Sequence, residues 1–174
     1  MNIKKFLVIL IILAGFWYAF FGQKMLPVSE SSAEAYLKTI KKVKSPDVLQ
    51  LIQDKKGHLQ LVHIFKSNCI LCRIYFQDIV DTARQYPEIP VIVIATDRHP
   101  LLLASFLSGR NLPFTPLMLD DSPESLAGAL KTIDMHYDDN EPYTVVIDRN
   151  GQVIEFSVGS GFASRISSYF EEKK

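Results

Sequence analysis

The sequence alternates between short apolar runs and stretches in which apolar residues recur every three or four positions. Apolar, β-branched runs at 59–65 and 90–96 predict strands buried in a sheet, and a shorter run at 114–119 predicts a third strand. The three- and four-residue spacing is typical of amphipathic helices. The helices predicted in this way cover residues 31–43, 47–56, 69–86, 100–110 and 123–135. Strands that alternate with helices predict an α/β sandwich with right-handed crossovers.

The last part of the chain departs from this alternation. Strands are predicted at 143–147 and 152–158, on either side of the segment 148–151 (DRNG). The Asn-Gly pair of that segment supplies the positive φ angles that a tight hairpin turn requires. A final helix, predicted at 162–170, is expected to cover one face of the sheet.

The N-terminal segment predicts a membrane anchor. Residues 6–22 (FLVILIILAGFWYAFFG) carry no charge and are flanked by Lys4, Lys5 and Lys24. As a helix this segment would be about 26 Å long, which is within the range that spans a bilayer. Lys4 and Lys5 should stay in the cytoplasm, so a single pass through the inner (cytoplasmic) membrane should place the rest of the chain in the periplasm or another extracytoplasmic space. A cleaved signal peptide is the alternative, although no pair of small residues marks a good cleavage site.

The length and composition of the chain predict one globular domain in addition to this anchor. The chain has 174 residues, 48% of them hydrophobic and 22% charged, which is typical of a packed protein and excludes collagen-like or wholly disordered classes. We expect the anchor at 1–23, a linker and N-terminal helix at 24–44, and the folded domain at 45–174. Lys plus Arg equals Asp plus Glu at 19 each, so the charge balance predicts no nucleic acid partner.

The only two cysteines, Cys69 and Cys72, stand three residues apart at the start of a predicted helix. That separation allows a reversible disulfide, whereas two cysteines are half of what a four-thiolate zinc site needs. The first sulfur lies at the helix N-terminus, where unpaired amides and the helix dipole favour a thiolate, and the second lies deeper. We therefore expect Cys69 to be the nucleophile and Cys72 the resolving thiol. Two buried structural cysteines, or a copper site completed by other ligands, are the alternatives.

Two segments of the sequence resemble the thioredoxin superfamily. Residues 61–72 (LVHIFKSNCILC) align without a gap to the family pattern Leu-Val-Asp-Phe-Trp-Ala-x-Trp-Cys-x-x-Cys. Residues 140–151 (NEPYTVVIDRNG) look like the Pro-Thr-x-x-x-Ile-Asp-x-x-Gly stretch of the bacterial redoxin branch, which contains membrane-anchored, exported thiol-disulfide oxidoreductases, among them those of cytochrome c maturation. The resemblance covers roughly residues 45–172. It implies an α/β, thioredoxin-like fold, with a central mixed β-sheet flanked by helices.

The resemblance also implies roles for single residues. In the family, a buried acid six residues before the first cysteine manages the proton of the second thiol, and His63 stands at that position here. The family's cis-proline, which starts a strand beside the cysteines, corresponds to Pro142, with Pro116 as the rival candidate. The residues expected to form the groove for a partner chain are Asn68, Ile70, Leu71, Glu141, Pro142 and Tyr143.

Together these features predict a membrane-anchored, exported thiol-disulfide oxidoreductase that acts through Cys69 and Cys72 on the thiols and disulfides of partner proteins, with a membrane redox partner. No organic cofactor and no metal is expected, because the cysteine pair itself carries the electrons. Glu141 is expected close to the Cys69 sulfur, where its charge would oppose the thiolate unless Lys66 neutralises it. A non-enzymatic binding module or a copper carrier that uses the same fold and cysteines is the alternative.

Overall fold

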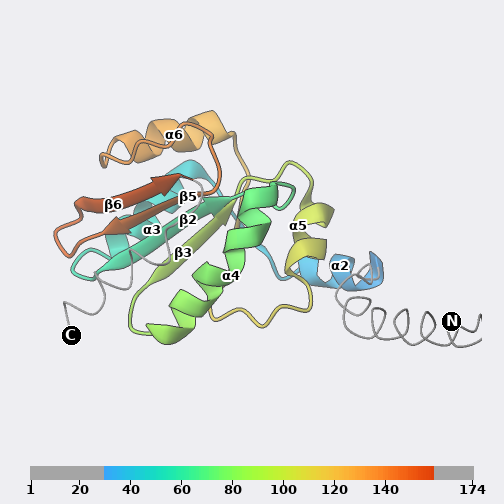
Figure 1. Cartoon of the computed structure of the whole chain (residues 1–174). Coiled ribbons are helices and arrows are strands. Elements are labelled where there is room, and N and C mark those ends of the chain that lie inside the picture. The colour runs from blue at the N-terminus through green and yellow to red at the C-terminus, as the bar shows by residue number, and fades with distance from the viewer. Residues whose placement is uncertain (1–29, 159–174) are drawn as a thin grey trace, which may run out of the picture. The chain divides into compact units, whose positions relative to one another are not determined.

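The structure of the protein is a computed structural model that describes residues 30–158. Its helices are α2 (Glu30–Leu37), α3 (Ser45–Asp54), α4 (Ile70–Gln85), α5 (Pro100–Leu107) and α6 (Pro123–Lys131). Its strands are β1 (Lys41–Val43), β2 (Gln60–Phe65), β3 (Val91–Ala95), β4 (Leu117–Leu119), β5 (Tyr143–Ile147) and β6 (Val153–Val158). Figure 1 shows a single sheet with helices packed on both of its faces.

The strands form one mixed sheet in the order β1-β4-β3-β2-β5-β6. The pairs β1·β4, β4·β3 and β3·β2 are parallel, and β5 and β6 are added antiparallel beside β2. β2 therefore has a neighbour on each side, and every one of its residues is buried. The cysteines that follow β2 consequently lie at the carboxyl end of an interior strand rather than beside an edge strand.

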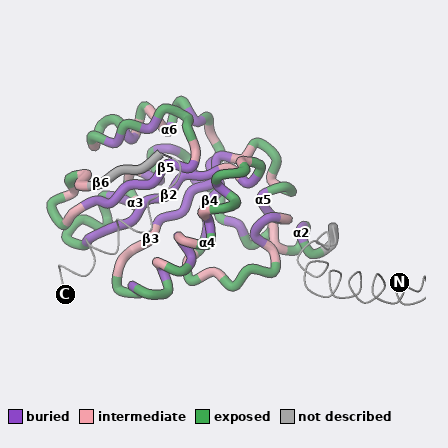
Figure 2. Tube along the Cα trace, in the orientation of Figure 1, coloured by how far each residue is buried: buried purple, intermediate pink, exposed green. Residues whose placement is uncertain are grey.

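Two apolar clusters cover the two faces of the sheet, and successive residues of β2 alternate between them. Phe65 belongs to the cluster with α4 and α5, whereas Ile64 belongs to the cluster with α3 and α6. Figure 2 shows the buried positions running along the central strands, with the exposed positions on the outer sides of the helices. The central α/β sandwich that the sequence predicts is thus confirmed.

Several predicted elements have different limits in the structure. The helix predicted at 31–43 ends at Leu37, and β1 follows it, because β1 pairs in parallel with β4 and buries Val43. The apolar pattern of this segment is local, so it cannot show that a strand far along the chain pairs with it. β4 begins at Leu117 rather than at 114, since Pro116 has no N–H to contribute to the ladder. The helices predicted at 100–110 and 123–135 end earlier, at Leu107 and Lys131.

Two predicted segments, the anchor at 6–22 and the final helix at 162–170, lie outside the described residues. Between positions 30 and 158, no helix combines the length and the hydropathy needed to cross a bilayer. The sheet already includes β1, which precedes position 45, where the sequence predicts that the folded domain begins.

Candidate active site

Both cysteines lie where β2 passes into α4. Cys69 is the N-cap of α4, and its backbone N–H donates to the carbonyl of Lys66 at 3.2 Å, which closes the turn after β2. The Sγ atom of Cys69 accepts a hydrogen bond from the backbone N–H of Cys72 at 3.1 Å. One of the free N–H groups at the helix start therefore points at the first sulfur, as the sequence predicts.

The two sulfurs differ in exposure and in proton affinity. Cys69 is partly exposed, Cys72 is fully buried, and both are free thiols. Burial raises the pKa of the Cys72 thiol well above its usual range, and the hydrogen bond to Cys69 raises it further. Cys69 is thus the sulfur that is open to solvent, and Cys72 keeps its proton. Within residues 30–158, no group of three or more His, Cys, Asp or Glu side chains is arranged to hold a metal ion.

The loop between β2 and Cys69 is held in place by an aspartate from the end of β3. Asp97 accepts both the backbone N–H of Ser67, at 3.0 Å and 3.1 Å, and the Ser67 hydroxyl. Burial raises the pKa of the Asp97 carboxyl, and the bonds from Ser67 work in the opposite direction. The loop that carries the first cysteine is therefore tied to the neighbouring parallel strand.

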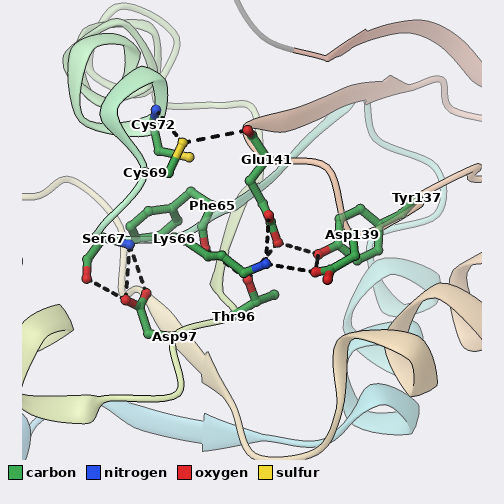
Figure 3. Close-up of polar contacts among 10 residues, drawn as sticks. All are labelled: Phe65, Lys66, Ser67, Cys69, Cys72, Thr96, Asp97, Tyr137, Asp139 and Glu141. Atoms are coloured by element: carbon green, nitrogen blue, oxygen red, sulfur yellow. Dashed lines mark hydrogen bonds and ion pairs between the residues drawn. The ribbon is translucent and has the colours of Figure 1, made fainter.

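The peptide bond between Glu141 and Pro142 is cis, and within the described ranges it is the only cis bond. Pro142 is thus the cis-proline that the resemblance implies, and Pro116 is not. The thiol of Cys69 donates to the backbone carbonyl of Glu141 at a distance of 3.6 Å (Figure 3). The segment before β5 therefore lies directly against the first sulfur.

The carboxylate of Glu141 is turned away from the Cys69 sulfur and into the protein (Figure 3). Its side chain is only 4% exposed. The hydroxyls of Tyr137 and Thr96 donate to it at 2.5 Å and 2.8 Å, and the Nζ atom of Lys66 lies 3.0 Å away. The backbone of Glu141 thus faces the Cys69 sulfur, whereas its carboxylate belongs to a buried network.

Lys66 joins two carboxylates of this network, since its Nζ atom lies 2.8 Å from Asp139 as well as 3.0 Å from Glu141. Burial lowers the pKa of Lys66, but the hydrogen bonds to Asp139 and Glu141 outweigh it, so the pKa is raised overall. The bond from Lys66 lowers the pKa of Asp139, and burial followed by the bond to Glu141 raises the pKa of Tyr137. The countercharge that the sequence suggests for Glu141 is therefore present.

His63 lies inside the sheet, on β2 opposite Thr144 of β5, and is 1% exposed. Its Nδ1 atom is 2.9 Å from the Thr144 hydroxyl, its ring stacks on Phe65, and its Nε2 atom has no hydrogen-bond partner in the described part of the chain. Burial lowers the pKa of His63 to about 3, so the ring is neutral at physiological pH. The proton-handling role that the resemblance implies for His63 stays a prediction, and such a weak base is a poor acceptor for the Cys72 proton.

The residues predicted to form the groove fall into two sets. Asn68, Ile70 and Leu71 are exposed beside Cys69, with Ile70 as much as 75% exposed. Tyr143 instead is 2% exposed, and its ring packs on the other face of the sheet, in the cluster with α3 and α6. Its side chain therefore cannot line a surface groove as the sequence predicted, because β5 turns this residue towards the core.

Sequence analysis missed three residues that hold the site together, namely Thr96, Asp97 and Tyr137. Thr96 and Asp97 directly follow β3, and polar residues at the carboxyl end of a parallel strand are a general signal of a site, which could have identified them. Tyr137 lies in an irregular segment after α6, where no local pattern marks it.

Comparison with solved structures identifies the fold as thioredoxin-like. The chain is similar to a secreted disulfide oxidoreductase of Mycobacterium tuberculosis that is homologous to E. coli DsbE, with a TM-score of 0.55 and 18% identity over 69% of this chain and 85% of that chain. It is similar to a thiol:disulfide interchange protein of the thioredoxin family from Chlorobium tepidum TLS, with a TM-score of 0.57 and 20% identity over 69% and 82% of the two chains. A DsbF homologue from Corynebacterium diphtheriae gives a TM-score of 0.59 and 15% identity over 70% and 75%. No protein-family model and no curated protein matches the sequence.

Proposed function

We propose that this chain is an exported, membrane-anchored thiol-disulfide oxidoreductase that exchanges disulfides with partner proteins through Cys69 and Cys72. The observation that carries the proposal is the asymmetry of the two thiols, with a reachable Cys69 at the start of α4 and a buried, protonated Cys72 behind it. The proteins of similar structure are named as a disulfide oxidoreductase and a thiol:disulfide interchange protein, which supports the same chemistry here. The anchor and the export are proposed from the apolar segment at 6–22.

The exchange proceeds in two balanced steps. The Cys69 thiolate attacks a disulfide of the partner, so that a mixed disulfide forms and one partner sulfur leaves as a thiolate. Cys72 then loses its proton and attacks the Cys69 sulfur, which forms the Cys69–Cys72 disulfide and releases the second partner sulfur. Two electrons pass from the cysteine pair to the partner, and the reverse sequence oxidises partner thiols instead.

The partner chain is proposed to lie across Cys69, between the Glu141–Pro142 segment and the start of α4. The Glu141 carbonyl marks one side of this groove, and the exposed side chains of Asn68, Ile70 and Leu71 mark the other. A hollow of about 200 Å³ opens next to Asn68 and could hold a partner side chain.

Trapping in cells tests the proposed function. In Cys72→Ser the first step still occurs but the second does not, so partner proteins are expected to accumulate as mixed disulfides on Cys69. The measurement is a non-reducing gel of the purified protein, followed by release of the partners with a reductant and their identification. The control is Cys69→Ser, in which these species should be missing. If Cys72→Ser carries no more mixed disulfide than Cys69→Ser, the exchange function is refuted.

The asymmetry itself predicts which thiol reacts with a small reagent. In the folded, reduced protein, iodoacetamide is expected to alkylate Cys69 and to leave Cys72 unmodified, because Cys72 is buried and protonated. Peptide mass spectrometry after brief labelling measures both sites. Labelling in denaturant, where both cysteines should react, is the control, and equal rates in the folded protein would contradict the assignment.

A further inference from the structure

Two arginines lie over one aromatic ring near the cysteine pair. The guanidinium carbon of Arg73 is 5.3 Å from the centroid of the Phe106 ring, and that of Arg110 is 4.4 Å from the same centroid. Because both distances end at one point, the two charges are separated by less than about 10 Å, which is the screening length of 0.1 M salt. Burial lowers the pKa of Arg110, and the positive charge of Arg73 lowers it further, as expected for two cations that repel each other.

The fold holds both side chains in place. Phe106 of α5 packs its ring edge-on against Phe76 of α4, 5.0 Å away between centroids, in the apolar cluster that the two helices share. Arg110 follows α5 and donates from its Nε atom to the Phe106 carbonyl at 2.7 Å. Arg73 lies near the start of α4, where its backbone N–H donates to the carbonyl of Cys69 at 3.1 Å. Both guanidinium groups are therefore held against a rigid ring, so less conformational entropy is lost when they bind a ligand.

Within residues 30–158, neither Arg73 nor Arg110 has an acidic partner, since every ion pair of this range joins other residues. Arg84, further along α4, differs in this respect. Its guanidinium group lies 3.5 Å from the Asp81 carboxylate and also donates to the carbonyl of Asn111. Two neighbouring cations that repel each other and have no counterion are suited to a carboxylate, whose two oxygens match the forked N–H groups of arginine.

The two arginines border an exposed apolar surface that begins beside Cys69. Ile70 and Ile74 on α4 and Leu102 on α5 are all exposed. Figure 1 shows α4 and α5 next to each other on one face of the sheet. Exposed apolar side chains that lie together mark interaction surfaces, and arginine is among the residues that contribute most binding energy there. A protein whose cysteine is joined to Cys69 would therefore also cover this surface.

We propose that Arg73 and Arg110 together bind a carboxylate of the partner protein, from an aspartate or glutamate close to the cysteine that exchanges with Cys69. This inference rests on the proposed function and names the chemical class of partner that the site accepts. Arg73 stands one helical turn after Cys69, so an acidic residue a few positions from the partner's cysteine can reach it. The bound carboxylate stabilises the mixed disulfide and offsets the repulsion between the two guanidinium groups.

Paired peptides test this preference on the full-length chain in a neutral detergent. Each peptide carries one cysteine joined by a disulfide to thionitrobenzoate, and the two differ only in having two glutamates or two glutamines beside that cysteine. Attack by the Cys69 thiolate on the peptide sulfur forms the mixed disulfide and releases one coloured thionitrobenzoate ion, which stopped-flow absorbance follows. Each rate is divided by that of 2-mercaptoethanol with the same peptide. The glutamate peptide is expected to react about three- to tenfold faster at low salt and less than about twofold faster in about 0.5 M NaCl.

The ratio of the two peptide rates cancels any general change in the reactivity of Cys69, so it can be compared among variants. In the double variant Arg73→Gln, Arg110→Gln the ratio should fall to about one. Arg84→Gln is the matched control, because it removes an exposed arginine of the same helix that already has Asp81 as its partner, and it should leave the ratio unchanged. A ratio near one in the unmodified chain overturns the inference, and so does a preference that survives in the double variant.

A second measurement needs no substitution of an arginine. In Cys72→Ser either peptide stays joined to Cys69, and modification of arginines by phenylglyoxal is then measured by mass spectrometry. The glutamate peptide should slow the modification of Arg73 and Arg110 about threefold more than the glutamine peptide does, with Arg84 as the internal control. Equal modification with the two peptides overturns the inference.

Two other outcomes are recognised separately. If nanodiscs of phosphatidylglycerol protect the two arginines of the peptide-free chain and nanodiscs of phosphatidylcholine do not, lipid headgroups occupy the pair and the inference is overturned. Failure of the proposed function appears instead as an absence of trapped partner proteins in cells that carry Cys72→Ser, whereas the activated peptides react with Cys69 in either case.

Discussion

Lowering the pH from about 6 to about 4 is expected to take about 2.5 kcal/mol from the free energy of unfolding through His63 alone. His63 is 1% exposed, and burial lowers its pKa to about 3 in the folded state from an ordinary value of 6.5. Between these values the unfolded chain binds a proton on this side chain and the folded chain does not. The contribution is therefore complete above about pH 6.5 and is lost progressively as the pH falls towards 3. Urea unfolding at a series of pH values measures it.

A variant that cannot titrate isolates this effect from the other acid-sensitive groups. His63→Asn can retain a hydrogen bond to Thr144 but takes up no proton, so its stability should depend less steeply on pH than that of the unmodified protein. If the substitution also changes the free energy of unfolding through packing, that change is the same at each pH. His58→Gln changes an exposed histidine and should leave the steep dependence intact. Parallel curves for His63→Asn and the unmodified protein would show that the buried imidazole is not the cause.

Phe76→Ala is expected to lower the free energy of unfolding by about 3–5 kcal/mol. Phe76 is fully buried at the centre of the cluster between α4, α5 and the sheet. Its ring lies 4.9 Å from that of Phe65 and 5.0 Å from that of Phe106, measured between centroids. Truncation leaves a cavity among rigid rings that cannot collapse around it, so the cost falls in the upper part of the range for core residues. Chemical denaturation at neutral pH gives the value.

Ile74→Ala provides a matched control on the same helix. Ile74 is 58% exposed, so its truncation should change the free energy of unfolding by no more than about 0.5 kcal/mol. Because α4 begins at the cysteines, Phe76→Ala should also increase the alkylation of Cys72 under native conditions, through more frequent opening of the helix. A loss of less than about 1 kcal/mol in Phe76→Ala would mean that this cluster is packed more loosely than the structure describes.

The placement of the two cysteines was largely predictable from local spacing. Two cysteines three residues apart, after a β-rich run and at the start of a helical stripe, specify the N-cap sulfur and the buried sulfur without further information. The hairpin of β5 and β6 follows in the same way from its turn. The position of Pro142 could be predicted only through the resemblance to a known family, because a cis bond leaves no periodic signal in a sequence.

What the site residues do was decided by contacts between distant segments. Glu141 was expected beside Cys69 because it precedes Pro142. The direction of its side chain, however, depends on donors from the residue after β3, from the turn after β2 and from the segment after α6. Tyr143 was expected in the groove, yet its position on β5 places its side chain in the apolar cluster with α3 and α6, on the other face of the sheet.

The sequence by itself therefore determined the order of the elements from α3 to β6 and the place of the cysteine pair at the start of α4, because helix caps, strand runs and turns depend on residues a few positions apart. Only the tertiary structure decided that 41–43 is a strand, that His63 is a neutral core residue and that Glu141 carries a buried charge paired with Lys66. Strand pairing, burial and ion pairing each join residues that lie tens of positions apart. A local sequence pattern does not include the distant residue that a given residue contacts, and that contact decides the conformation or the charge of the residue.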